Sequence, residues 1–77
     1  MYTVQKLATL AGVSARTLRY YDSIGLLISQ KNESGYRVYG SAEIDRLQLI
    51  LFYRELGFGL QDIAKLLDDP DFDETEA

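Results

Sequence analysis

Apolar residues recur with helical spacing near the start of the chain, and a glycine ends that pattern. The apolar positions within Val4–Ala11 fall on one side of a helix. Thr3 can cap the start of this helix, and Gly12 suits the left-handed conformation that often ends one. Ser14 is a second capping candidate, and a second helical segment follows over residues 15–23. Two short helices joined by a turn around glycine are typical of a helix-turn-helix motif.

Helical geometry divides the second expected helix into two faces. At about 100° per residue, Ala15 and Leu18 point towards the core, while the opposite face is polar and aromatic. Arginine can read the edge of guanine and bind phosphate, and a tyrosine hydroxyl can donate to a phosphate oxygen. An ordinary solvated face would also explain the arginines, but it explains an outward tyrosine less well. The expected DNA-facing residues are Arg16, Thr17, Arg19 and Tyr20.

A polar loop separates two short stretches that we expect to be extended. Residues Ile24–Ile28 begin the first extended stretch. The loop over residues 30–35 ends on a glycine. In the stretch after the loop, strand alternation places Arg37 and Tyr39 on one side and Tyr36 on the other. Two interpretations remain open: the hairpin is a wing whose arginine and a neighbouring tyrosine reach DNA, or it only covers the core.

A third helix is expected from Ser41, which can cap it, to Leu56, and a fourth over residues 60–67 after the break at Gly57–Gly59. The third helix is apolar on two sides, and such a helix needs cover on both. A chain of 77 residues offers little material for that cover, so we expect a partner surface or a further segment. The expected core side carries Ile44, Leu47, Ile50 and Leu51, and the other side carries Leu49, Phe52, Tyr53 and Leu56.

Composition removes most catalytic and metal chemistry. The chain has no cysteine and no histidine, which excludes thiolate zinc sites and the commonest general base. The carboxylates near the end lack the spacing of a calcium loop. We therefore expect no enzyme activity, no cofactor and no metal. No stretch has the length and apolar character of a membrane span, and no signal-peptide pattern is present, so we expect a cytoplasmic protein without a membrane partner.

Charge is distributed unevenly along the chain. Residues 1–40 carry five basic and two acidic side chains, a net of +3, whereas residues 41–77 carry three basic and ten acidic ones, a net of −7. Salt screens charges beyond roughly 8 Å, so a basic half can bind DNA while an acidic half faces away. The overall charge of −4 therefore does not exclude a nucleic-acid partner.

Four sequence blocks, in this order, resemble the MerR family of bacterial transcriptional regulators. The blocks are Val13–Asp22, Gly25–Leu27, Gly35–Tyr39 and Leu56–Phe58, and the resemblance extends from Tyr2 to about residue 69. Within the family the chain looks most similar to the drug- or antibiotic-induced activators. The resemblance implies a mainly α fold with a small β-hairpin: a winged helix-turn-helix with four helices and two wings, without the family's dimerisation helix.

The resemblance also assigns roles to individual residues. It implies a recognition helix in the major groove, a first wing at the hairpin and a second wing at the turn Leu56–Gly59. Tyr21 belongs to the motif, and we expect it to be half packed. The expected DNA-contacting residues are Arg16, Thr17, Arg19 and Tyr20 on the recognition helix, Tyr36, Arg37 and Tyr39 in the first wing, and Arg54 leading into the second.

The resemblance further implies partners and a domain boundary. Residues 1–69 would form the DNA-binding domain, and residues 70–77 an acidic tail or the start of a linker to a dimerisation helix. The full-length protein would be a homodimer in the bacterial nucleoid. It would bind promoter DNA, respond to an effector and act on RNA polymerase indirectly by distorting the promoter.

Two other function classes remain open at this stage. An architectural DNA binder of the excisionase kind would bend DNA without sensing an effector. A protein-interaction module would instead use the apolar third helix to bind another regulator. An enzyme is the weakest alternative, because no acid–base or nucleophile pair is present.

Overall fold

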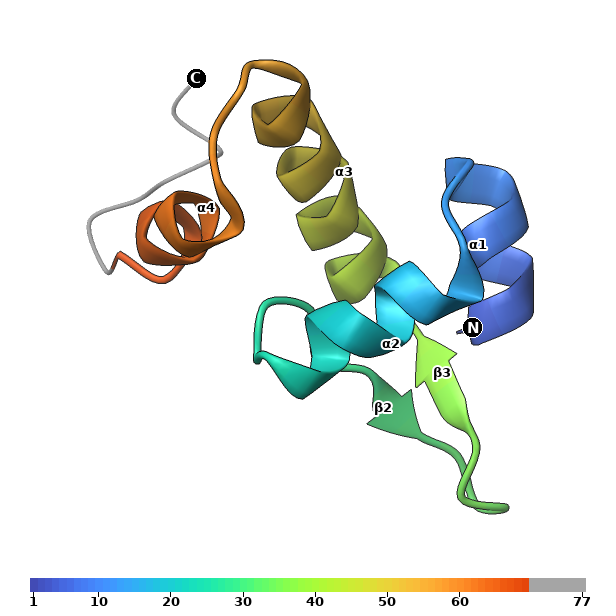
Figure 1. Cartoon of the computed structure of the whole chain (residues 1–77). Coiled ribbons are helices and arrows are strands. Elements are labelled where there is room, and N and C mark those ends of the chain that lie inside the picture. The colour runs from blue at the N-terminus through green and yellow to red at the C-terminus, as the bar shows by residue number, and fades with distance from the viewer. Residues whose placement is uncertain (70–77) are drawn as a thin grey trace.

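Two short helices joined at a glycine form the first half of the structure. In the computed structural model, which describes residues 1–69, α1 spans Val4–Ala11 and α2 spans Ala15–Ser23 (Figure 1). The hydroxyls of Thr3 and Ser14 each accept a backbone N–H from the first turn of the helix that follows. Gly12 ends α1 with a φ of 73°. Both predicted caps and the glycine stop are confirmed.

A three-stranded antiparallel sheet lies beside the helix pair. The strands are β1 (Tyr2–Thr3), β2 (Gln30–Lys31) and β3 (Arg37–Tyr39), in the order β1-β3-β2. A hairpin was predicted here, but its first strand, β2, lies within the stretch that was expected to be the loop. The hairpin projects away from the helices in Figure 1. Strand β1 was not predicted. It places Tyr2 opposite Tyr39 in register, so the sheet joins the start of the chain to the hairpin.

The stretch from Ile24 to Ile28, expected to be extended, forms a turn instead. Gly25 has a φ of 77°, which lets the chain fold back beneath the end of α2. The backbone N–H groups of Leu26 and Leu27 both donate to the carbonyl of Tyr21, at 2.9 and 3.1 Å. This turn fully buries both leucine side chains, so the segment adds to the core instead of lengthening the hairpin.

The third and fourth helices pack against each other across a tight turn. Helix α3 spans Ser41–Glu55 and α4 spans Leu60–Leu67. Ser41 does not cap α3, as the sequence suggested, but is its first residue. The capping position is Gly40, whose backbone N–H donates to the Glu43 carboxylate at 2.7 Å. The Glu43 carboxylate therefore satisfies the backbone N–H of the capping residue, and no side chain caps the first turn as a serine was expected to do.

The core lies between the four helices and one face of the sheet. The winged helix-turn-helix arrangement of four helices and a small hairpin is confirmed. Among the described helices, none is both long enough and apolar enough to cross a membrane. The buried residues that form the core are Leu7, Ala8, Leu18, Tyr21, Leu26, Leu27, Tyr39, Leu47, Ile50 and Ile63.

The second apolar side of α3 is only partly covered. Tyr53 packs its ring edge-on against Phe58 in the turn before α4, with the centroids 5.5 Å apart. Phe52 and Leu56 are 56% and 60% exposed, respectively. The turn before α4 thus covers part of this side, and a bare apolar strip remains, as the sequence predicted.

Candidate nucleic-acid interface

The outer face of α2 carries four of the predicted site residues. Arg16 and Arg19 are exposed, and Tyr20 is 54% exposed although its ring is large and apolar. Thr17 is half-buried, and its hydroxyl lies 2.9 Å from the hydroxyl of the cap residue Ser14. The predicted helix orientation is confirmed. Arg16, Arg19 and Tyr20 can contact a ligand, whereas Thr17 also takes part in the helix cap.

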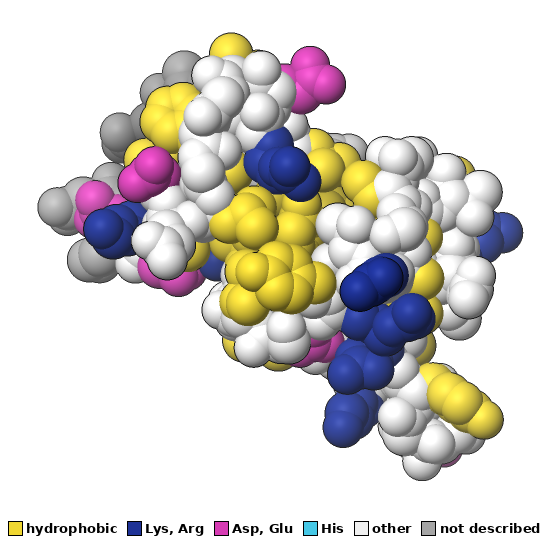
Figure 2. Space-filling model, in the orientation of Figure 1, with side chains coloured by type: hydrophobic (Ala, Val, Ile, Leu, Met, Phe, Trp, Pro, Cys, Tyr) yellow, Lys and Arg dark blue, Asp and Glu magenta, His cyan; other side chains and the backbone are white. Residues whose placement is uncertain are grey.

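A hollow of about 360 Å³ opens between the start of α1, helix α2 and the hairpin. Arg19, Lys31 and Arg37 bring three positive charges to its lining, and Tyr36, which is 70% exposed, stands at its rim. Among residues 1–69, no acidic side chain lines this hollow. Figure 2 shows several Lys and Arg side chains in a band that runs from the helices down to the hairpin, while others lie singly elsewhere on this face.

The position of Lys31 was not anticipated as part of the site. It occupies β2, and the sheet register places it directly opposite Arg37. The signal in the sequence was only a single lysine in a polar loop, which most often marks a solvated surface. Its partner across the hairpin could be known only once the register was fixed. Thr3, Val4 and Gln5 at the N-terminus of α1 also line the hollow, and the positive end of the helix dipole there favours an anion.

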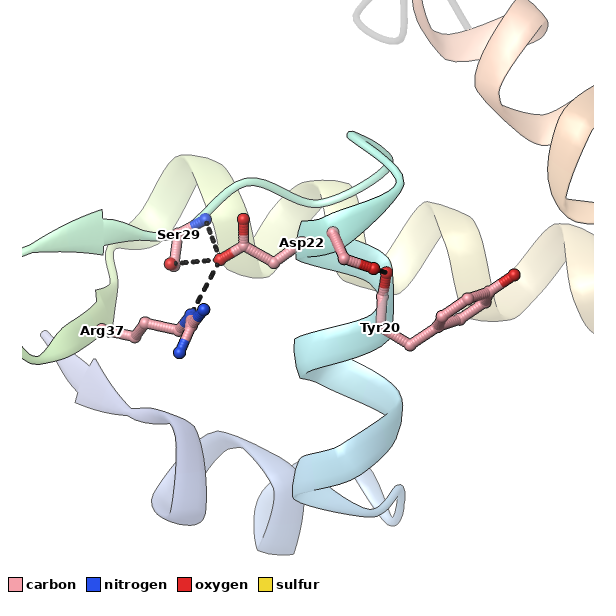
Figure 3. Close-up of polar contacts among 5 residues, drawn as sticks. Tyr20, Asp22, Ser29 and Arg37 are labelled. Atoms are coloured by element: carbon pink, nitrogen blue, oxygen red, sulfur yellow. Dashed lines mark hydrogen bonds and ion pairs between the residues drawn. The ribbon is translucent and has the colours of Figure 1, made fainter.

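Arg37 is tied to the end of α2. Its Nε donates to Oδ2 of Asp22 at 3.2 Å, and the same oxygen accepts the Ser29 hydroxyl at 2.6 Å and the Ser29 backbone N–H at 3.4 Å (Figure 3). Burial raises the pKa of the Asp22 carboxyl. The hydrogen bonds from Ser29 and the positive charge of Arg37 outweigh burial, so this pKa lies below its ordinary value. The carboxylate is therefore charged at neutral pH, and the Arg37 side chain remains 44% exposed.

Arg54 lies near the end of α3, just before the turn predicted to be the second wing. Its Nη1 donates to the hydroxyl of Tyr21 at 2.8 Å. Tyr21 was expected to be half packed, but it is only 1% exposed and belongs to the core. The structure thus joins an exposed arginine of α3 to a buried tyrosine of α2.

Tyr39, predicted as a DNA contact, is completely buried, and this prediction is wrong. Strand alternation correctly grouped it with Arg37, but the shared side turns inwards: Tyr39 enters the core, and only the longer Arg37 reaches the surface. Within residues 1–69 the Tyr39 hydroxyl has no partner at hydrogen-bonding geometry. Burial raises the pKa of this phenol, and the negative charge of Asp22 adds to the effect. The nearby Ser29 side chain acts to lower the pKa of this phenol, but its hydroxyl donates to Asp22.

The remaining site residues divide into two groups. Arg16, Arg19, Tyr20, Tyr36 and Arg37, with the half-buried Thr17, occupy adjoining parts of α2 and the hairpin, whereas Arg54 is contributed separately by α3. Their contact with DNA stays a prediction. Within residues 1–69 no histidine, cysteine or acidic side chains gather as a set of metal ligands.

A glycine-linked helix pair, an arginine-bearing second helix and a basic hairpin define a winged helix-turn-helix protein. The chain belongs to the MerR family, because residues 2–69 match the profile of the MerR HTH family of regulatory proteins. The family predicted from the four sequence blocks is confirmed.

Individual relatives agree with this membership. The chain is 57% identical over 70 residues to the transcriptional activator TipA of Streptomyces coelicolor, a match that covers 90% of this chain and 28% of TipA. It therefore spans little more than a quarter of that relative. The N-terminal structure of the Bacillus subtilis multidrug transporter activator, MtaN, superposes with a TM-score of 0.90 at 45% identity, covering 99% of this chain and 73% of that one.

The structure of a third relative contains DNA. HiNmlR, a MerR family regulator that lacks the sensor domain, was solved bound to promoter DNA. It matches with a TM-score of 0.77 at 37% identity, over 83% of this chain and 52% of that one. The relatives named here are transcriptional regulators, not enzymes.

Proposed function

We propose that this chain is the DNA-binding domain of a transcriptional regulator and that it recognises a specific sequence in duplex promoter DNA. The observation that carries the proposal is the exposed face of α2, where Arg16, Arg19 and Tyr20 project beside a basic hollow. An α-helix fits the major groove, where arginine can donate two hydrogen bonds to one guanine. The proposed domain comprises residues 1–69, and residues 70–77, which lie outside the described part, lead towards a dimerisation helix.

The two flanks of the face suit the DNA backbone. On one flank, Lys31 and Arg37 reach out from the hairpin, and on the other, Arg54 projects from α3. A phosphate bound by lysine or arginine releases a counterion, so each such contact adds affinity for every sequence and makes binding depend on salt. Base contacts from the central helix then supply the preference for one sequence.

The full-length protein, in this proposal, is a homodimeric, effector-responsive activator in the bacterial cytoplasm, acting at the nucleoid. The apolar strip of Phe52 and Leu56 on α3 supports a dimer, because exposed apolar surface of this kind favours a protein partner. Similarity to TipA and MtaN, both named as activators, supports activation. The protein would distort the promoter and so act on RNA polymerase indirectly. In this proposal the protein has no enzyme activity and binds no cofactor.

The proposal is tested by comparing a helix arginine with a hairpin arginine. Arg16→Ala should weaken binding to the preferred duplex by about 1–3 kcal/mol and weaken binding to random duplexes less, because a base contact is lost. Arg37→Ala should weaken binding to all duplexes alike and lower the slope of log affinity against log salt by about one. Fluorescence anisotropy with a duplex selected from a random pool provides both measurements.

The matched control is Lys65→Ala, which removes one positive charge from the exposed last turn of α4. It should leave the sequence preference unchanged. If Arg16→Ala lost the same affinity for preferred and random duplexes, Arg16 would contact phosphate and not a base. Absence of any affinity for duplex DNA at low salt would overturn the proposed function.

A further inference from the structure

Two consecutive residues near the end of α2 each hold an arginine of a different flank. Asp22 binds Arg37 of the hairpin, and Tyr21 binds Arg54 of α3. We propose that Tyr21 and Asp22 are positioning residues that fix both backbone-contacting arginines relative to the recognition helix. This inference rests on the proposed function, and it concerns how the DNA-facing surface is held in shape before DNA arrives.

The contact between Asp22 and Arg37 leaves most of the guanidinium free. Arg37 uses its Nε, and an arginine has four further N–H donors on its two terminal nitrogens. Figure 3 shows the Arg37 side chain extending from the hairpin towards the end of α2. Ser29 holds the same carboxylate oxygen with two hydrogen bonds, so the carboxylate is itself fixed. The fixed Asp22 carboxylate therefore orients the remaining N–H donors of Arg37.

The contact between Tyr21 and Arg54 uses the core as its support. The Tyr21 ring is fully packed, and only its hydroxyl meets the exposed arginine, at 2.8 Å from Nη1. A packed ring has no freedom to change rotamer, so the position of the hydroxyl is set by the core. Arg54 is thereby anchored to α2, although it lies thirty-three positions further along the chain.

Neighbouring residues on a helix point about 100° apart, so Tyr21 and Asp22 face different sides of α2. One side meets the hairpin, and the other meets α3. Both flanking arginines are consequently held against the recognition helix. A long side chain that is already ordered loses less entropy on binding, so this arrangement favours affinity at both flanks.

If Asp22 acts only through its charge, its removal should strengthen DNA binding, whereas a positioning role predicts weaker binding. The carboxylate is a negative charge close to the expected position of a phosphate, and its removal would then strengthen binding to every duplex. Positioning predicts that removal weakens binding even though the net charge becomes more positive. The sign of the change therefore separates the two roles.

The test uses Tyr21→Phe and Asp22→Asn in the 77-residue chain, with duplex binding measured over a series of salt concentrations. Each variant should lose about three- to tenfold in affinity, equally on preferred and random duplexes, because one long side chain must now be ordered on binding. The slope of log affinity against log salt should also fall, towards that of Arg54→Ala for Tyr21→Phe and towards that of Arg37→Ala for Asp22→Asn. In Tyr21→Phe/Arg54→Ala, affinity should be no lower than in Arg54→Ala alone, and Asp22→Asn/Arg37→Ala should likewise match Arg37→Ala.

A thermal unfolding curve for each variant separates lost folding from lost positioning, and Tyr21→Phe keeps the ring that packs in the core. A second measurement needs no DNA. NMR relaxation of the Arg37 Nε–H group should report an ordered side chain in the unaltered chain and a mobile one in Asp22→Asn. Unchanged binding by Tyr21→Phe, or tighter binding by Asp22→Asn, beside normal binding by the unaltered chain would overturn this inference alone. Absence of duplex binding by the unaltered chain would overturn the proposed function as well.

Discussion

Four tyrosines near the proposed interface divide into two exposed and two buried residues. Tyr20 and Tyr36 are 54% and 70% exposed, whereas Tyr21 and Tyr39 are almost wholly enclosed. The exposed pair can offer a hydroxyl to a phosphate. The buried pair differ from each other, since the Tyr21 hydroxyl accepts a hydrogen bond and the Tyr39 hydroxyl has no partner among the described residues.

That difference gives a prediction for Tyr39. Replacement by phenylalanine removes a buried hydroxyl that has no partner in residues 1–69 and keeps the ring, so Tyr39→Phe should raise the free energy of unfolding by about 1 kcal/mol. Affinity for duplex DNA should not change. Urea unfolding and anisotropy measure the two quantities, with the exposed Tyr36→Phe as the control for stability. A clear loss of DNA affinity in Tyr39→Phe would instead indicate that the Tyr39 hydroxyl contacts DNA.

Asp22 gives a prediction for acid stability. Its pKa is lower in the folded chain than the ordinary value of 3.8, so the carboxylate adds stability above that value and loses this contribution as the pH falls through the folded pKa. Asp22→Asn should therefore be less stable than the unaltered chain at neutral pH. The two should converge below pH 3.8. Urea midpoints measured across this range test the expectation, and a constant difference at all pH values would contradict it.

Residue type and spacing could predict part of the candidate site. The phase of one helix was enough to place Arg16, Arg19 and Tyr20 outwards, because helical geometry is local. Alternation grouped Arg37 with Tyr39 correctly, but it could not say which side of the strand faces the core. That choice depends on tertiary packing, because α1, from the start of the chain, and α3 both pack against β3. The two hydrogen bonds that hold Arg37 and Arg54 depend on tertiary packing in the same way.

At the scale of elements, the helices follow local rules and the sheet does not. Thr3, Ser14 and Gly12 set the ends of α1 and α2 through contacts within a few residues, and all three were predicted from the sequence. Strand β1 has only two residues, and its pairing with β3 depends on tertiary structure. The turn after Ile24 was mistaken for a strand because a short apolar run fits either state.

Gly12 provides the prediction at this scale. Its φ of 73° lies in the left-handed region, and a Cβ added there would meet nothing within 4 Å, so the penalty for a side chain is conformational and not a clash. Gly12→Ala should lower the free energy of unfolding by about 1–2 kcal/mol. Gly12→Asn should lower it less, because asparagine tolerates this conformation. Equal losses for the two variants in urea unfolding would show that strain at this turn is not the cause.

At the scale of the whole molecule, opposite charges collect at opposite ends of the chain. The net charge of +3 on residues 1–40 and −7 on residues 41–77 accompanies a basic band on the face shown in Figure 2. Electrostatic attraction should thus orient the domain as it approaches DNA. One domain can neutralise only a few phosphates, so its affinity alone should be modest.

Joining two copies of the chain through a flexible linker should change that affinity strongly. If the preferred duplex is a near-palindrome, the second copy binds at a high effective concentration, and the affinity should rise by about 10²–10⁴-fold over a single copy. A duplex with one half-site should show little gain. Equally tight binding of both duplexes by the joined chain, or nanomolar binding by a single copy, would contradict a symmetric two-site target.

The pairing of Tyr2 and Thr3 with the hairpin also has a consequence for biogenesis. On the ribosome these two residues emerge before both helices of the motif, yet Val38 and Tyr39, which they face in register, emerge only after those helices have been synthesised. Contacts between nearby segments form before those that close a long loop. The two nascent helices should consequently pack against each other early, and the pairing of β1 with β3 should form only after the hairpin has been synthesised.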